Sequence, residues 1–110
     1  MNAISVTLEN QDEHHGRYVA RVDGKEGEAE LVFTWRGEHL LSADHTYAPE
    51  EMRGSGVAMA LVERLIADAR AQGFKIIPLC PYIQAKYEEH PGWADVMTVA
   101  PGEKPHLKLH

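Results

Sequence analysis

Apolar and polar residues alternate along the first half of the chain, which is the pattern of β-strands with one buried face. This alternation predicts four strands, at residues 4–9, 17–23, 28–35 and 39–47. The segments DGKEG and RGE, which separate the last three strands, are typical of tight turns. We therefore expect these three strands to form an antiparallel meander.

The period of the pattern changes after Gly56. Apolar residues then recur at the spacing of one helix face, at Ala58, Leu61, Val62, Leu65 and Ala69. This spacing predicts an amphipathic helix. We expect Gly73 to end the helix, with Phe74 making the hydrophobic contact that often follows such a glycine.

The segment after this helix predicts a fifth strand and a second helix. Residues 75–80 (KIIPLC) form the strand, in which Pro78 cannot be a fully bonded central residue because it lacks an N–H. A short helix then begins on Pro81, a favoured first-turn residue, and runs over residues 81–90. The final LKLH is expected to add a strand or to fray. The chain is thus an α+β protein with one domain, residues 1–97, and a tail, residues 98–110.

Composition and charge argue against several classes of function. The chain has 110 residues, with 17 acidic and 11 basic side chains and a formal net charge of −6. This balance argues against a general nucleic-acid binder, which needs clustered Lys and Arg. We expect neither a membrane span nor a signal peptide, because no apolar run approaches about 20 residues and no basic segment opens the chain. A single cysteine, Cys80, favours a cytoplasmic protein without disulfides.

Metal binding is not expected, although the chain contains seven histidines. The sequence has no H-E-x-x-H or C-x-x-C motif, and no acid–histidine set has the spacing of metal ligands.

The segment RGSG, at residues 53–56, opens the first helix. The first N–H groups of a helix have no partner inside it and carry the positive end of the helix dipole. Because Gly54 and Gly56 lack Cβ atoms, an anion such as a phosphate can approach the main chain there. The alternative is that the glycines only make a sharp turn between strand and helix.

Two familiar phosphate motifs do not match this segment. No lysine follows the glycines, as a P-loop requires, and Met59 stands where the dinucleotide fingerprint needs its third glycine or alanine. What remains is R-x-x-G-x-A, formed by Arg53, Gly56 and Ala58.

This motif resembles the coenzyme A pyrophosphate loop of the GCN5-related N-acetyltransferases (GNAT). More narrowly, HTYAPEEMRGSGVAMALV and IIPLCPYIQAKYEEHPGWADV are similar to the small, single-domain acetyltransferase-like group of about a hundred residues. That group shares the patterns H-T-x-x-P-E-x-x-R-G-x-G-[IV]-A and I-x-P-x-C-x-[FY]. The resemblance implies an antiparallel-rich mixed sheet whose fourth and fifth strands splay apart around acetyl-CoA. The cofactor-binding residues implied are Tyr47, Arg53, Gly54, Ser55, Gly56, Val57, Ala58, Tyr82 and Tyr87.

The chain departs from the wider superfamily in one respect. Most members place one or two helices between their first two strands, and these helices form much of the acceptor-binding wall. Here only NQDEHHG separates the first two strands. We therefore expect the acceptor side to be open or built by a partner chain, with a monomer and a homodimer both compatible.

Acetyl transfer to an amine requires a neutral amine, a polarised thioester carbonyl and a proton for the departing thiolate. Backbone N–H groups near Tyr47 and Ala48 are candidates for holding the carbonyl. His45 is a candidate base, since a histidine pKa of about 6.5 suits proton transfer at neutral pH. It is expected to share a face with Leu41 and Ala43, which fits a structural role equally well.

Cys80 precedes the short helix, and a helix N-terminus favours the thiolate form of cysteine. It is a candidate nucleophile, a candidate lining of the pantetheine channel, or a buried core residue. Tyr82 and Tyr87 are candidate proton donors to the thiolate, with core packing as the alternative. Two functions follow: an acetyl-CoA-dependent N-acetyltransferase acting on a primary amine of a protein or polyamine, or a coenzyme A-binding module without efficient catalysis.

Overall fold

The computed structural model describes residues 3–105. Its elements are, in chain order, β1 (Ile4–Asn10), β2 (His15–Val22), β3 (Ala29–Gly37), β4 (Leu40–Tyr47), η1 (Glu50–Met52), α1 (Val57–Gln72), β5 (Lys75–Pro78), α2 (Pro81–Glu89) and η2 (Pro91–Val96). The α+β class, the five strands and both predicted helices are confirmed. The predicted strand at residues 107–110 lies outside the described residues.

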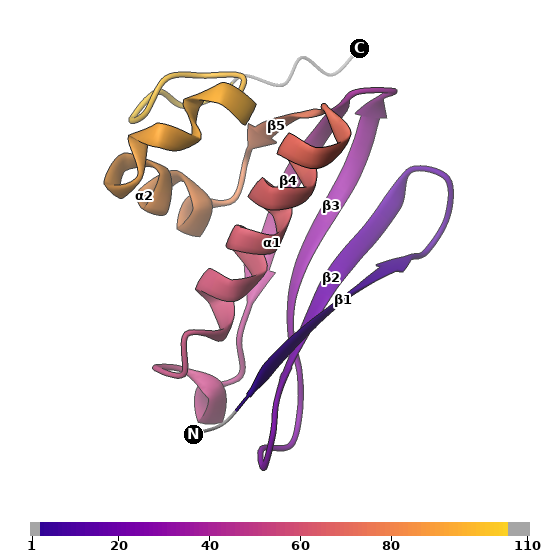
Figure 1. The fold of residues 1–110 in the computed structure, drawn as a ribbon, viewed down its shortest axis with the longest axis vertical. Helices are drawn as coiled ribbons and strands as arrows, with labels where there is room; N and C mark the ends of the chain where they lie inside the picture. Colours follow the sequence, from indigo (N-terminus) through magenta and orange to yellow (C-terminus); the bar gives the residue numbers. More distant parts are fainter. Residues whose placement is uncertain (1–2, 106–110) are drawn as a thin grey trace.

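The strands form one mixed sheet in the order β1-β2-β3-β4-β5. Strands β1 to β4 pair antiparallel through short turns, whereas β5 pairs parallel with β4. Parallel neighbours need a long crossover, and α1 provides it by running back across the sheet (Figure 1). None of the helices in residues 3–105 has the length and apolar composition needed to span a membrane.

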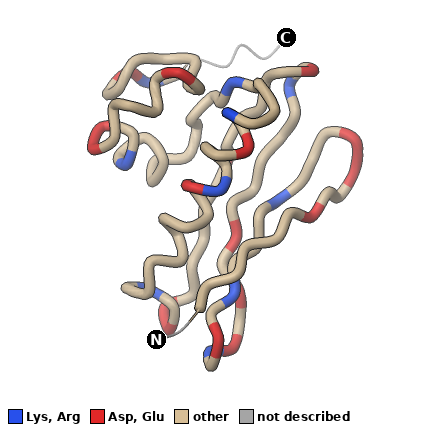
Figure 2. The backbone as a smooth tube through the Cα atoms, in the orientation of Figure 1, with Lys and Arg blue, Asp and Glu red and all other residues tan. Residues whose placement is uncertain are grey.

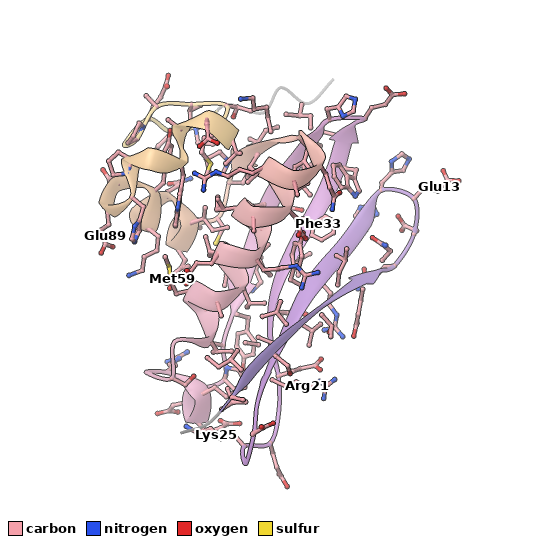
Figure 3. The ribbon with its side chains drawn as sticks, viewed as in Figure 1. Glu13, Arg21, Lys25, Phe33, Met59 and Glu89 are labelled. Carbon is pink, nitrogen blue, oxygen red and sulfur yellow. The ribbon has the colours of Figure 1, made fainter. Side chains whose placement is uncertain are left out.

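The core lies between α1 and one face of the sheet. Strands β2 and β3 contribute Tyr18, Leu31 and Phe33, and Phe33 lies beside α1 in Figure 3. The buried face of α1 consists of Val57, Leu61, Val62, Leu65, Ile66 and Ala69. Ala58, which was expected on this face, is only half-buried. Gly73 ends α1 as predicted, with φ 78°, and Phe74 is buried beside it.

The second helix packs on the same side of the sheet as α1. Ile83 and Tyr87 of α2 and Trp93 of η2 belong to the same core as the buried residues of α1. The opposite face of the sheet carries mainly polar and charged side chains, including Arg17 and Glu30. The short helix η2 was not predicted.

Strand β5 is shorter than expected and ends at Pro78. Its pairing with β4 also ends there, at the pair Ala43 and Pro78. The next two N–H groups, of Leu79 and Cys80, both donate to the carbonyl of Ala43, at 3.1 and 2.9 Å. The chain therefore turns away from β4 and enters α2, while β4 continues to Tyr47.

A cluster of polar side chains connects α1 to β1 and β2 by hydrogen bonds. The Tyr18 hydroxyl donates to Asp68 at 2.7 Å, and Arg64 donates to Asp68 at 3.2 Å and to the Val6 carbonyl at 3.1 Å. Burial raises the pKa of Tyr18 well above its usual range, and the hydrogen bond to Asp68 raises it further.

Removing this hydroxyl should alter stability in a pH-dependent way. We expect Tyr18→Phe to lower the free energy of unfolding by about 1 kcal/mol near neutral pH, through loss of the hydrogen bond. In the wild type, stability should fall as pH rises above about 10, where an unfolded tyrosine ionises but the folded Tyr18 does not. Tyr18→Phe should show a shallower alkaline fall, measured by urea unfolding from pH 7 to 11.

The matched control is Tyr47→Phe, which removes a hydroxyl from a side chain that is 49% exposed. Its alkaline curve should follow the wild type. An equally steep fall in Tyr18→Phe and wild type would contradict the assignment of the alkaline loss to Tyr18.

Candidate functional site

The parting of β4 from β5 opens a cavity of about 630 Å³. Its walls are the end of β4, the loop before α1, the first turn of α1, and α2. The lining residues are Thr46, Tyr47, Ala48, Met52, Arg53, Gly54, Gly56, Val57, Ala58, Met59, Tyr82 and Lys86. This volume lies within the range of small-molecule sites.

The loop at residues 53–56 borders this cavity. Its N–H groups at Arg53 and Ser55 donate to the carbonyls of Glu50 and Met52, at 3.1 and 3.2 Å, which leaves those of Gly54 and Gly56 for a ligand. Gly54 and Gly56 have φ of 83° and 87°, a region that other residues seldom adopt. The first backbone bond of α1 runs from the Ala60 N–H to the Gly56 carbonyl, at 3.0 Å. The preceding N–H groups, of residues 57–59, have no partner within the helix and carry its positive dipole end.

Both explanations of the glycines remain compatible with this geometry. The positive φ values show that the turn itself requires glycine. A Cβ atom at Gly54 or Gly56 would meet nothing within 4 Å, so open space also lies beside the main chain, where an anion could approach. Arg53 stands next to this space, its Nε 3.4 Å from the carbonyl of Ala48. The Ser55 hydroxyl instead donates to the carbonyl of Met52.

Cys80 lies next to the cavity but does not line it. It is the N-cap residue of α2 and is only 2% exposed. Its Sγ donates to Oγ1 of Thr46, at 3.3 Å, and Thr46 itself lines the cavity. The thiol therefore sits one side chain behind the cavity wall.

His45 does not share a face with Leu41 and Ala43, contrary to the expectation from alternation. The pairing of β3 with β4 shifts register between Val32 and Phe33, so that Ala43 pairs with Phe33 but His45 pairs with Val32. Such a β-bulge inserts one residue and turns the following side chains to the other face. His45 is consequently exposed on the face away from α1.

The two tyrosines of α2 occupy different environments. Tyr82 lines the cavity, as expected. Tyr87 is buried in the core and donates to the carbonyl of Val99 at 2.7 Å, so the structure does not bring it to the cavity. Five residues along a helix correspond to a rotation of about 140°, which places the two side chains on different faces.

Lys86 is a cavity residue that the sequence patterns did not single out. It lies one turn after Tyr82, with its Nζ 5.6 Å from the centre of the Tyr82 ring. The i, i+4 spacing from Tyr82 is the signal that could have identified it.

The cavity lining holds no Asp, Glu or His side chain. Elsewhere in residues 3–105, no group of three such side chains or cysteines is arranged to hold a metal ion. The chemistry available at the cavity is therefore that of backbone N–H groups, two cations, hydroxyl groups and the neighbouring thiol.

A family model described as GCN5-related N-acetyl-transferase matches residues 17–96, which is more than half of the chain. This chain belongs to that family. Protein NATD1 of Homo sapiens is 26% identical over 80 residues, which cover 73% of this chain and 71% of the human protein. Protein NATD1 of Xenopus tropicalis is 26% identical over 87 residues, or 79% of each chain.

A solved structure shares the fold. The crystal structure of ribosomal-protein-alanine N-acetyltransferase from Brucella melitensis biovar Abortus 2308 aligns with a TM-score of 0.63 and 17% identity. The alignment covers 97% of this chain and 99% of that chain.

This GCN5-related chain has a short connection between β1 and β2. Residues 11–14 alone join β1 to β2, without the helices expected in larger relatives. On the face away from α1, Arg17 contacts the carboxylates of Glu9, Glu28 and Glu30 at 2.9, 3.1 and 2.8 Å. These three ion pairs lie on a sheet face that no helix of residues 3–105 covers (Figure 1).

Proposed function

We propose that the chain binds acetyl-CoA in the cavity between β4 and α2 and transfers the acetyl group to a primary amine. One observation carries this proposal: a loop with two glycines at positive φ precedes α1 and borders a cavity whose charged residues are both cations. Helix N-termini with free N–H groups bind phosphates. Membership in the GCN5-related N-acetyl-transferase family supports an acyl-CoA as the ligand that carries this phosphate.

The edge of β4 supplies a place for the pantetheine arm and the thioester. The β4–β5 ladder ends at Ala43, whereas β4 runs on to Tyr47. Alternate backbone groups of a strand point to each side, so those of residues 44–47 that face β5 are available to a ligand. An N–H there, near Tyr47 and Ala48, is suited to polarise the thioester carbonyl.

Cys80 is the nucleophile that we propose for a two-step route. The Cys80 sulfur attacks the acetyl carbon and the bond to the coenzyme A sulfur breaks, while the proton of the Cys80 thiol passes to the departing coenzyme A thiolate. The neutral amine then attacks the acetyl-cysteine, the bond to the Cys80 sulfur breaks, and the proton that the amine loses returns to that sulfur. Burial of Cys80 would shield an acetyl-cysteine from water, but the thiol reaches the acetyl carbon only if the Thr46 side chain moves out of its path. The alternative is direct transfer, with Cys80 as a neighbour of the thioester.

The acceptor is an exposed amine, such as one on a protein or a polyamine. The sheet face away from α1, which no helix of residues 3–105 covers (Figure 1), supports this proposal because a protein surface or an extended polyamine can reach it. His45 lies on that face and would act as a base only toward an amine that approaches from there.

One observation favours a second function, that of a coenzyme A-binding module with little catalysis: the cavity lining has no acidic or histidine side chain to act as a base. An assay of acetyl-CoA hydrolysis and of transfer to a panel of amines distinguishes the two functions. Tight binding of coenzyme A with no transfer to any amine would favour the module.

The glycine loop can be tested by a charge-bearing substitution. Gly56→Asp should weaken coenzyme A binding by more than about tenfold, since it places a carboxylate against a phosphate. The measurement is calorimetry with coenzyme A. Gly24→Asp is the matched control, because Gly24 has φ 83° and equally open surroundings but lies in the β2–β3 turn. Wild-type affinity in a folded Gly56→Asp variant would refute the phosphate site.

The role of Cys80 can be tested by mass spectrometry and turnover. If Cys80 is the nucleophile, acetyl-CoA should leave one hydroxylamine-sensitive acetyl group on its peptide. Cys80→Ala should then lose the adduct and most of its transfer rate while still binding coenzyme A. Transfer by Cys80→Ala at the wild-type rate, with no adduct on the wild type, would instead support direct transfer.

A further inference from the structure

The cavity between β4 and α2 carries positive charge in an acidic protein. The whole chain has a net charge of −6, yet the two charged residues in the cavity lining, Arg53 and Lys86, are both cations. They come from different walls: Arg53 from the loop before α1, and Lys86 from α2. Figure 2 shows blue segments in both places and no red segment on the first turns of α1 between them. This arrangement suits a ligand with more than one anionic group.

Lys86 is held at the cavity wall by weak contacts. Its Nζ lies 5.6 Å from the centre of the Tyr82 ring and 3.4 Å from Oε2 of Glu89. Glu89 is 60% exposed and lies three residues further along the same helix. Figure 3 shows Glu89 on the same side of the molecule as Met59 of α1. Such exposed pairs contribute little to stability, so the ammonium group can exchange Glu89 for a phosphate.

We propose that Lys86 binds a phosphate group of coenzyme A from the α2 wall, opposite the glycine loop. This inference rests on the proposed coenzyme A site. The nucleotide half of coenzyme A carries two anionic groups, a diphosphate and a ribose 3′-phosphate. The first N–H groups of α1 and Arg53 are the proposed site for one phosphate, and Lys86 supplies a second point charge of the kind that binds phosphate.

The consequence is a preference for phosphorylated ligands. Pantetheine, which lacks every phosphate, should gain nothing from Lys86. Coenzyme A and 3′-dephospho-coenzyme A differ only in the 3′-phosphate. A comparison of these two ligands with pantetheine therefore shows which phosphate group Lys86 contacts.

The test is calorimetry with these three ligands on the full chain. Lys86→Gln should bind coenzyme A about tenfold more weakly than the wild type, the loss of one charged contact, and pantetheine equally well. Lys86→Arg keeps the charge and should keep most of the affinity. The control Lys104→Gln removes the same charge from beside a different pocket, next to Tyr87 and Glu103, and should match the wild type.

The outcomes separate the two proposals. A loss for coenzyme A alone assigns Lys86 to the 3′-phosphate, and an equal loss for coenzyme A and its dephospho form assigns it to the diphosphate. Unchanged affinity of Lys86→Gln, an equal loss for pantetheine, or a loss in Lys86→Arg as large as in Lys86→Gln would overturn the role of Lys86 and leave the cofactor site standing. A wild-type chain that binds no coenzyme A would overturn both.

Discussion

Two backbone N–H groups, those of Leu79 and Cys80, donate to one carbonyl, that of Ala43, and the rest of the site depends on this arrangement. Pro78 has no N–H with which to continue the ladder, so the chain leaves β4 at this point. Pro81 then opens α2, where its missing N–H has no consequence. Because β4 continues alone, its free edge and the first turn of α1 enclose the cavity together with α2.

The β-bulge in β4 decides which side chains face that cavity. After the register shift, Thr46 pairs with Leu31 and lies on the α1 side, where it meets the thiol of Cys80. His45 falls on the other face. The cavity lining therefore has hydroxyl groups and two cations, with the thiol of Cys80 behind Thr46. Under the proposed function, a base for the amine would come from the opposite face or from water.

Much of this architecture could be predicted from the sequence because it depends on local patterns. Strand alternation, the helix stripe and the end of α1 at Gly73 each involve neighbouring residues, and the structure confirms them except at His45 and Ala58. The face of His45 could not be predicted, because the bulge arises from pairing with β3. For Tyr87 the structure shows the alternative of core packing, because helical spacing separates it from Tyr82, and the same spacing brings Lys86 to the cavity.

The candidate site has two parts, the cavity proposed for the cofactor and the sheet face around His45. In residues 3–105 the first part is well formed, with a volume of about 630 Å³ and a loop shaped by positive φ angles. The face around His45 is open, and its nearby arginine, Arg17, is already bonded to three carboxylates. A small amine would bury little surface there, and binding energy follows the area removed from water. Under the proposed function, selectivity for an acceptor therefore comes from the surface that surrounds its amine, and the cavity governs the affinity for coenzyme A.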